Sequence, residues 1–289
     1  MARPILIAGA GGMLGHALRQ VCAATGRESV APAEREFDIT SEEEVARAVA
    51  EFAAAYPDGA VVNAAAFTNV ERAEDEPELA FLVNETGAQL LAEAAARKGL
   101  PFVHVSTDFV FDGTKDGAYT EKDETNPLSV YGRSKLAGEI AVASAHPGAL
   151  TVRTAWVFGP AGVNFPTKII DRARMTDSVS VVNDESGSPT YTLDLAAGIL
   201  GLLDVGASGL FHLAGSGSCA RDEMAREILR LAGLTHVEVV PVPASTFPSK
   251  AARPANSVLD CSKAAELGVT MPDWRDALAR FVRAMDDPR

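Results

Sequence analysis

The sequence has few of the residues that build metal centres or disulfide frameworks. Its three cysteines (Cys22, Cys219 and Cys261) are widely spaced, no Cys-x-x-Cys occurs, and the five histidines show no ligand spacing. This favours a reduced compartment and argues against a zinc site. No apolar run approaches the roughly 18 residues of a membrane span. A net charge of -13 argues against nucleic-acid and anionic-membrane partners. We therefore expect a cytoplasmic protein with neither kind of partner.

A glycine-rich turn joins an apolar strand to a helix at the N-terminus. Pro4–Ala8 is apolar, Gly9, Gly12 and Gly15 follow, and residues 16–21 have helical periodicity. In a dinucleotide-binding turn the first glycine permits the tight turn, the second lets a pyrophosphate approach, and the third lets the helix pack on the strand. The positive end of the helix dipole also favours phosphates. An ordinary turn is the alternative, but the position directly after an N-terminal strand favours a dinucleotide.

Strand-like and helix-like segments alternate through the first half of the chain. Strands are expected at Ile5–Ala8, Ala60–Ala65, Pro101–Ser106 and Thr151–Val157, and helices at Ser41–Tyr56 and Glu78–Lys98. This alternation predicts an α/β fold with a doubly wound parallel (Rossmann) sheet.

The last third of the chain is richer in Gly, Pro, Ser and Asn, between helices expected at Leu193–Leu203 and Arg221–Ala232. Such loops suit a smaller substrate-binding lobe over the carboxyl edge of the sheet. We expect an NAD(P)-binding Rossmann domain over residues 1–155. Residues 156–289 should form mainly the C-terminal substrate-binding lobe, with some segments returning to the Rossmann domain.

Tyr131 and Lys135 are four residues apart at the start of a helical stretch, so both side chains lie on one face of that helix. A nearby positive charge favours the phenolate, whose unperturbed pKa is about 10. We therefore expect Lys135 to lower the pKa of Tyr131. Taken alone, the spacing is equally typical of a surface pair on an amphipathic helix.

Ligands of doubly wound folds bind at the carboxyl ends of the strands. Asn63–Ala66 closes one expected strand with small side chains, and Ser106–Asp108 closes the next with hydroxyls. A hydroxyl, the Tyr131 phenol and the Lys135 ammonium converging on a dinucleotide form a carbonyl-reducing site. The hydroxyl polarises the carbonyl and the phenol donates the proton. Capping of the strand end is the alternative for Ser106 and Thr107.

These segments resemble the extended short-chain dehydrogenases/reductases and, within them, the dTDP-4-dehydrorhamnose reductase family. Motifs shared with the wider superfamily are the glycine turn, Asp38–Thr40, Val62–Ala66, Ser106–Phe111, Tyr131–Lys135 and Arg153–Val157. More discriminating matches are Asn164–Phe165, Asn183–Thr190 and Arg253–Leu259. The resemblance covers nearly the whole chain.

The resemblance implies that NADPH or NADH reduces the 4-keto group of dTDP-4-dehydro-L-rhamnose to give dTDP-L-rhamnose. It assigns catalysis to Thr107, Tyr131 and Lys135, with Asp108 beside them. It places the cofactor along Gly9, Gly12, Met13, Leu14, Gly15, Asp38, Ile39, Asn63, Ala64, Ala65, Ala66, Tyr131 and Lys135. It places the nucleotide-sugar along Thr107, Asp108, Phe109, Trp156, Asn164, Phe165 and Arg253.

Two of these substrate residues have plain alternatives. Trp156 is equally well a core aromatic, because buried tryptophans usually pack. Arg253 is expected to hold the substrate diphosphate, since its fork can make two parallel charge-assisted bonds. Its alternative is a surface arginine paired with a nearby acid.

The chain departs from the family pattern after the second expected strand, at Glu34-Arg35-Glu36. Arg35 can bind the 2′-phosphate of NADPH, but its two neighbours repel it, so the choice between NADPH and NADH stays open. Some relatives are magnesium-linked dimers through glutamates that we do not map here. Magnesium is therefore not indicated by the sequence, and a homodimer stays open.

Two other functions compete with this one. The first is reduction of a different nucleotide-linked 4-keto-deoxysugar. The second is a non-catalytic NADP-binding subunit, like the β subunit of methionine adenosyltransferase. Intact Thr107, Tyr131 and Lys135 argue against the second.

Overall fold

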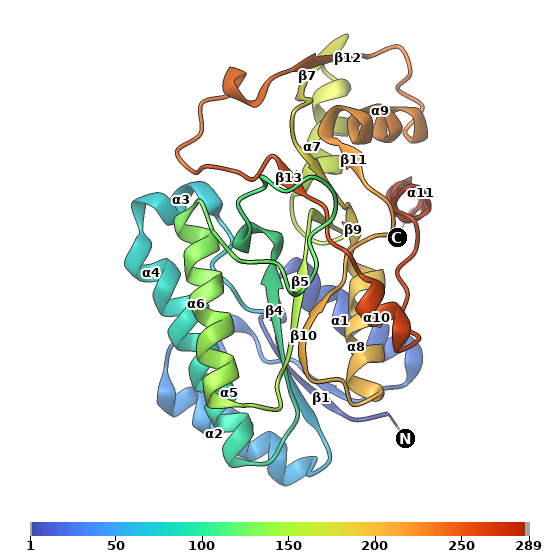
Figure 1. Ribbon diagram of the computed structural model, residues 1–289. Coiled ribbons are helices and arrows are strands. Elements are labelled where there is room, and N and C mark those ends of the chain that lie inside the picture. The colour runs from blue at the N-terminus through green and yellow to red at the C-terminus, as the bar shows by residue number, and fades with distance from the viewer. Residues whose placement is uncertain (1, 287–289) are drawn as a thin grey trace.

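Six parallel strands form the central sheet of the computed structural model, which describes residues 2–286 (Figure 1). The expected domain limits at residues 1 and 289 lie outside the described residues. The chain moves outward from β1 in both directions, so the switch point lies between β1 and β3. The predicted α/β class with a doubly wound parallel sheet is confirmed. In spatial order the strands are β2 (Ser29–Val30), β1 (Ile5–Ala8), β3 (Ala60–Asn63), β4 (Phe102–Thr107), β5 (Leu150–Thr154) and β10 (Gly209–His212).

Helices cover both faces of the sheet (Figure 1). One face carries α1 (Met13–Thr25) and α8 (Thr192–Asp204), and the other carries α2 (Glu42–Ala55), α5 (Ala88–Arg97) and α6 (Val130–Ala145). The helix expected at Ser41–Tyr56 is α2, which is capped by Ser41.

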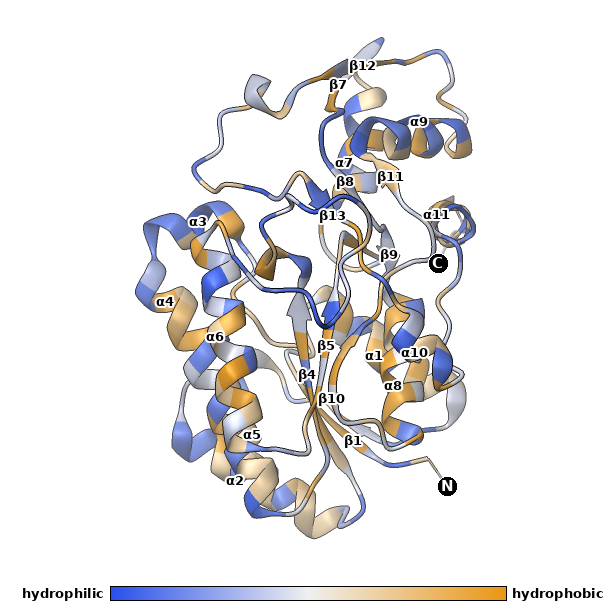
Figure 2. Ribbon diagram, in the orientation of Figure 1, coloured by the Kyte–Doolittle hydropathy of each residue, from blue (hydrophilic) through white to orange (hydrophobic). Residues whose placement is uncertain are grey.

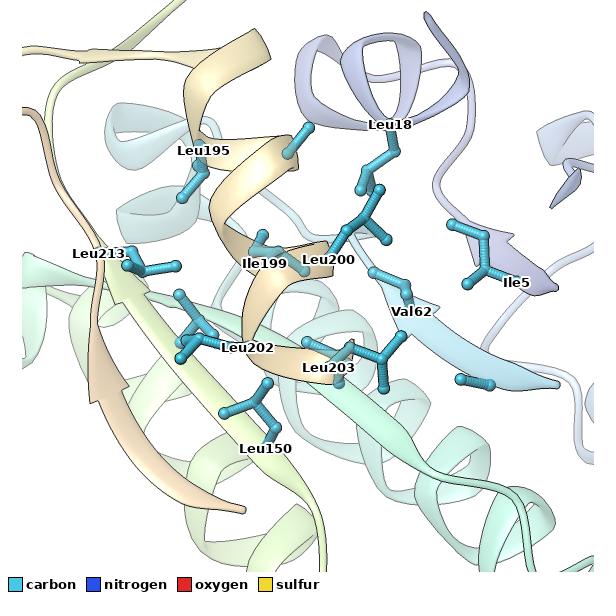
Figure 3. Close-up of a cluster of buried hydrophobic side chains, with 14 of the residues drawn as sticks. Ile5, Leu18, Val62, Leu150, Leu195, Ile199, Leu200, Leu202, Leu203 and Leu213 are labelled. Carbon is cyan, nitrogen blue, oxygen red and sulfur yellow. The ribbon is translucent and has the colours of Figure 1, made fainter. Parts of the chain in front are cut away.

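The two hydrophobic cores follow from the alternation of side chains along each strand. In β1, Ile5 packs in the cluster under α1 and α8, whereas Leu6 packs in the cluster under α2 and α5. Figure 3 shows the first cluster, with Leu18 and Ile199 turned toward the sheet. Each such buried side chain contributes about 1.5–3 kcal/mol. The largely hydrophobic colour of α8 in Figure 2 agrees with its buried position.

The helix expected at Glu78–Lys98 has a different hydrogen-bonding pattern in its middle. It consists of α4 (Pro77–Phe81), the π-helical turn η2 (Leu82–Gly87) and α5. In the wide turn the buried Asn84 side chain bonds the backbone of Phe67 and the hydroxyl of Ser134. These contacts hold the turn against α6, and their partners are too distant in sequence for periodicity to reveal them.

The strand expected at Thr151–Val157 is also divided. β5 ends at Thr154, and the two-residue β6 (Val157–Phe158) pairs elsewhere, with β9 (Thr190–Tyr191). Between them Trp156 has a φ of 46°, a left-handed conformation that ends the strand.

A further core lies beyond the carboxyl edge of the sheet. It includes Phe158, Ile170, Ile228, Trp274 and Phe281. By contrast, α8, β10 and α10 (Ser262–Glu266) lie with the sheet domain. The larger elements around the core beyond the sheet are α7 (Phe165–Ala173), β7 (Ser178–Val182), α9 (Arg221–Leu231), β12 (Glu238–Val242) and α11 (Trp274–Asp286).

Short segments complete the fold. Those near the sheet are η1 (Glu34–Glu36), α3 (Val70–Asp75) and η3 (Asp108–Val110), and those beyond it are β8 (Ser186–Gly187), β11 (Cys219–Ala220), η4 (Ala244–Thr246) and β13 (Asn256–Ser257). Within residues 2–286, no helix is long and apolar enough to cross a membrane.

Candidate active site

A cavity of about 610 Å³ lies at the carboxyl ends of β1, β3 and β4. This is the switch point where doubly wound folds bind ligands, and the volume is typical of small-molecule sites. It brings together predicted residues from six separate segments of the chain. They are Gly9, Gly12, Met13, Leu14, Asp38, Ile39, Ala64, Ala65, Ala66, Thr107, Asp108, Phe109, Tyr131, Lys135 and Trp156. Among the described residues, five predicted ones do not line it: Gly15, Asn63, Asn164, Phe165 and Arg253.

The glycine turn has the features that a phosphate requires. Gly9 has a φ of 78°, and a Cβ there would lie 2.5 Å from the backbone nitrogen of Ala65. Gly12 is the N-cap of α1, and a Cβ there would meet one atom, the Gly9 carbonyl oxygen, at 3.3 Å. The helix α1, all of which is described, begins without a side-chain cap. Its first N–H groups are therefore free for an anion, and the turn fits a dinucleotide pyrophosphate.

Asn63 lies behind the cavity wall rather than in it. Its Oδ1 accepts a hydrogen bond from the nitrogen of Ala65 at 3.0 Å, and its Nδ2 lies 3.3 Å from His104 Nδ1. It therefore shapes the Ala64–Ala66 segment, which does line the cavity.

The acidic end of the cavity is formed by Asp38, whose Oδ1 accepts hydrogen bonds from the nitrogen and hydroxyl of Thr40. Arg35 has 85% of its side chain exposed and lies 3.6 Å from Glu36. The side chain of Glu34 lies outside the described part of the chain. The arginine is thus already partly neutralised by one of the acids predicted to oppose a 2′-phosphate.

Tyr131 and Lys135 project from the first turns of α6 into the cavity. The Lys135 Nζ donates a hydrogen bond to the carbonyl oxygen of Val105 at 2.7 Å. Burial lowers the pKa of Lys135 to about 8, and Glu139 opposes this shift. Burial raises the pKa of Tyr131 to about 12, with Thr107 opposing and Asp108 adding to the rise.

The pKa of Tyr131 thus lies above its ordinary value, and not below it as the pairing with Lys135 had suggested. The spacing placed the two side chains on one face, but it carried no information on desolvation. Burial disfavours the phenolate more than its surroundings stabilise it. The phenol stays protonated across the physiological range, which is the form that can donate a proton.

The start of α6 is fixed by local contacts. Ser129 caps the helix by accepting a hydrogen bond from the nitrogen of Gly132 at 3.1 Å. A Cβ at Gly132 would lie 2.2 Å from the carbonyl oxygen of Phe109, so only glycine lets the helix approach η3 this closely. The Phe109 ring then meets the Tyr131 ring edge-on, with centroids 5.4 Å apart. These contacts orient the phenol toward the cavity.

Thr107 and Asp108 lie at the end of β4, beside Tyr131. The Thr107 hydroxyl donates to Asp108 Oδ1 at 2.9 Å and accepts from the nitrogen of Phe109 at 3.2 Å. The Thr107 hydroxyl therefore also caps the chain at the end of β4, the other role that the sequence suggested for it. Burial raises the pKa of Asp108, with Ser257, Thr107 and Arg221 opposing. The pair adds a hydroxyl and a carboxyl group to the cavity wall beside the phenol.

Arg221 is a residue of this region that the sequence did not reveal. Its guanidinium carbon lies 3.4 Å from the centre of the Trp156 ring, and its Nε lies 3.5 Å from Glu185 Oε2. A Cβ at Gly187 would lie 2.3 Å from the Trp156 ring. The indole therefore contacts the guanidinium of Arg221 and packs against a position where only glycine fits. One signal was present: an arginine as the first residue of a helix opposes the dipole.

The three predicted substrate residues outside the cavity have local partners. Asn164 caps α7, and its Nδ2 donates to the carbonyl oxygen of Gly159 at 2.7 Å. The Phe165 ring lies 5.3 Å from the guanidinium carbon of Arg221. Arg253 donates to Glu71 Oε1 at 3.1 Å, which matches its surface-pair alternative.

No group of three or more His, Cys, Asp or Glu residues within the described part of the chain is arranged to hold a metal ion.

Comparison with known proteins places this geometry in a family. The model of the RmlD substrate binding domain matches residues 2–286. A dTDP-4-dehydrorhamnose reductase of Mycobacterium tuberculosis is 42% identical, over 97% of this chain and 92% of its own. A dTDP-4-keto-6-deoxy-D-glucose reductase of Streptomyces niveus is 38% identical, over 95% of each chain.

A solved structure agrees with these relatives. The dTDP-4-dehydrorhamnose reductase of Bacillus anthracis, in complex with NADP, superposes with a TM-score of 0.93 at 34% identity. The match covers 98% of this chain and 100% of the other. The chain therefore belongs to the RmlD family, that of the dTDP-4-dehydrorhamnose reductases.

Proposed function

We propose that the protein reduces the 4-keto group of dTDP-4-dehydro-L-rhamnose to give dTDP-L-rhamnose, using NADPH or NADH. The observation that carries this proposal is the meeting of Thr107, Tyr131 and Lys135 at one end of a cavity that begins at the glycine turn. Family membership supports the substrate, and the NADP complex of the Bacillus anthracis relative supports the cofactor.

The residues of the cavity divide into cofactor-binding and reacting groups. Gly9–Leu14 and Ala64–Ala66 would hold the dinucleotide, with its pyrophosphate at the start of α1. When bound, the reduced nicotinamide supplies a hydride to the carbonyl carbon of the sugar. Tyr131 donates the proton to the carbonyl oxygen. The Thr107 hydroxyl, turning from Asp108 to the same oxygen, polarises it.

The lobe beyond the sheet would bind the nucleotide-sugar. We assign this role mainly to residues 156–289, apart from α8, β10 and α10. Trp156 lines the cavity and packs against the core beyond the sheet, and we place the sugar against it. Arg253 would hold the diphosphate after leaving Glu71. Asn164 and Phe165 would then support the lobe through their contacts rather than touch the substrate.

Reduction of another nucleotide-linked 4-keto-deoxysugar is the second candidate. It is favoured by the Streptomyces niveus relative, whose name gives a different keto-sugar at similar identity. The two candidates share every proposed reacting group, so they differ in the sugar that the lobe accepts.

A coupled assay tests both candidates. Consumption of NADPH and of NADH is followed with several dTDP- and UDP-linked 4-keto-deoxysugars, each generated in place. The leading proposal expects the highest kcat/KM with dTDP-4-dehydro-L-rhamnose. A higher value with another keto-sugar would favour the second candidate, and no consumption with any of them would contradict both.

We further propose a cytoplasmic location and a homodimer. The free thiols of Cys22, Cys219 and Cys261 support a reducing compartment. The homodimer rests on the family resemblance, and sedimentation of the purified protein tests it.

A further inference from the structure

Glu139 lies on the same helix face as the two groups proposed for the chemistry, one turn beyond Lys135 in α6. Only 9% of its side chain is exposed. A carboxylate so deeply buried stays charged only if it is paired and hydrogen-bonded. The hydrogen-bond partners of Glu139 therefore determine whether its carboxyl group can be charged beside Lys135.

Those partners come from two neighbouring strands. Glu139 Oε1 accepts hydrogen bonds from the Ser106 hydroxyl in β4 at 2.5 Å and from Arg153 Nε in β5 at 2.8 Å. Its Oε2 accepts from Arg153 Nη2 at 2.6 Å. This two-pronged pairing gives both carboxylate oxygens charge-assisted hydrogen bonds from a guanidinium. Glu139 thus fixes α6 to β4 and β5 beside the cavity, which Ser106 lines.

Lys135 is also held against β4, one residue away from the contact of Glu139. Its Nζ donates to the carbonyl oxygen of Val105, the residue before Ser106 in β4. Burial lowers the pKa of Lys135 to about 8, and the negative charge of Glu139 is the influence that raises it. With this pKa the lysine loses its charge about one pH unit above neutrality, and Glu139 counteracts that loss.

The neighbouring strands carry two other titratable groups and one fixed charge. Burial and the positive charge of Lys135 hold the pKa of His104 in β4 well below its usual value. Burial lowers the pKa of His212 in β10 to about 4. Both imidazoles are therefore neutral at pH 7. Arg153 in β5 is bound by Glu139 itself.

Three more groups face the first turn of α6. The carboxylate of Glu74 in α3 accepts from the nitrogen of Val130. Asp108 in η3 is buried, which raises its pKa, and Tyr131 in α6 is protonated. Glu74 and Asp108 belong to other elements, and Tyr131 lies one turn before Lys135 in α6, whereas Glu139 lies one turn after it.

We propose that Glu139 is a positioning residue for the reaction: it fixes the Lys135 ammonium against β4 and keeps it charged beside Tyr131. The effect on turnover rests on the proposed function. The coupling between the two side chains does not depend on it, so the two are measured separately.

The coupling is measured by titrating Lys135 directly. Protein carrying ¹³C at the lysine ε-carbons is followed by NMR, and the Lys135 signal is assigned by its loss in Lys135→Arg. In Glu139→Gln the titration midpoint should fall by about one pH unit, the low end for losing a close opposite charge. Glu139→Asp, which keeps the charge, should stay near the wild-type midpoint. As a matched control, Glu93→Gln removes a half-buried carboxylate of α5 that is paired with Arg97, and it should change nothing.

The functional consequence is read from the pH dependence of kcat. If the ammonium form is required, activity falls as pH rises through the pKa of Lys135. The alkaline limb in Glu139→Gln should therefore move to lower pH with the NMR midpoint. Because this variant leaves Arg153 without its carboxylate, Glu139→Gln/Arg153→Gln serves if the single variant does not fold. Its midpoint should also lie below the wild-type value.

An unchanged midpoint in a folded Glu139→Gln protein would overturn the proposal, as would a lowered midpoint with an unshifted kcat profile. If the wild-type protein reduces none of the keto-sugars, the proposed function fails. The NMR midpoints still decide whether Glu139 keeps Lys135 charged.

Discussion

Gly15 of α1 lies directly against the carbonyl oxygen of Gly9: a Cβ at Gly15 would be 2.1 Å from that oxygen. The two glycines therefore fix the helix against the end of β1 by close packing. Gly12, between them, is bounded by a single atom of the Gly9 backbone and borders the cavity. Three glycines of one motif thus differ in what a side chain would disturb.

Gly12→Val should abolish cofactor binding in a protein that still folds. The new side chain would occupy the space that the pyrophosphate needs, while its Cβ meets only the Gly9 oxygen at 3.3 Å. NADPH affinity by fluorescence titration and the far-UV circular dichroism spectrum check the two parts. Gly148→Ala, whose Cβ would meet the His146 ring at 3.6 Å far from the cavity, is the control. Unchanged NADPH affinity in Gly12→Val would contradict the assignment.

Tyr131→Phe should lower kcat by roughly 10²–10⁴, the usual scale for a positioned proton donor. Phenylalanine keeps the edge-on contact with Phe109 and loses the hydroxyl, so NADPH affinity should change little. Tyr56→Phe is a matched control, because Tyr56 packs on Phe52 away from the cavity. Near-wild-type turnover in Tyr131→Phe would remove Tyr131 from the reaction.

The parts of the site that follow from local sequence could be predicted. The strand Ile5–Ala8, the glycine turn and the helix capped by Ser41 depend on residues a few positions apart. The approach of Tyr131 to Thr107 followed from the rule that parallel strands end at one edge of the sheet. Each of these features is set by spacing and side-chain type.

The parts that depend on long-range packing could not be predicted. β10 joins the sheet beside β5, although β5 lies about sixty residues earlier in the chain. No local sequence pattern specifies that pairing. Arg221 reaches Trp156 from a different lobe segment. The pKa of Tyr131 depends on how deeply its ring is desolvated, which periodicity does not encode.

NADPH and NADH should be used with kcat/KM values within about tenfold of each other, or about 1.4 kcal/mol. Arg35 favours a 2′-phosphate, but it already lies 3.6 Å from Glu36 and is largely exposed. Glu36→Gln should therefore shift the preference toward NADPH, and Arg35→Ala toward NADH. Steady-state kinetics with both cofactors measure the ratio. A wild-type ratio above a thousand in either direction would mean that one charge dominates.

Acid should destabilise the protein through His212. Burial lowers its folded-state pKa to about 4, below the ordinary 6.5, so the unfolded chain binds more protons between these values. The unfolding free energy therefore falls as pH drops through this window. Between pH 7 and pH 5 this one group should account for about 2 kcal/mol.

Urea unfolding of wild type and His212→Gln at both pH values measures that contribution. The variant should lose less stability than the wild type between pH 7 and pH 5. His236→Gln, at an exposed position, should leave the difference unchanged. Equal pH dependence in wild type and His212→Gln would show that His212 is not responsible.

The contact between Arg253 and Glu71 determines how the substrate diphosphate can be bound. Glu71, in α3, accepts hydrogen bonds from the Ser249 hydroxyl, the nitrogen of Lys250 and the guanidinium of Arg253. Both charged side chains are more than two-fifths exposed. An ion pair this exposed is worth only about 0.2–1 kcal/mol. A diphosphate, which can accept two parallel bonds from the fork, should displace it.

Arg253→Ala should therefore raise KM for the nucleotide-sugar at least tenfold and leave NADPH affinity unchanged, because Arg253 does not line the cavity that contains the glycine turn. Lys250→Ala is the matched control: it removes a cation of the same loop that pairs with Asp75, and should change KM little. Glu71→Gln, which weakens the hold on Arg253, should lower KM modestly. Steady-state kinetics and NADPH titration separate these effects. A normal substrate KM in Arg253→Ala, or equal losses for both ligands, would leave Arg253 as a surface arginine that joins the loop to α3.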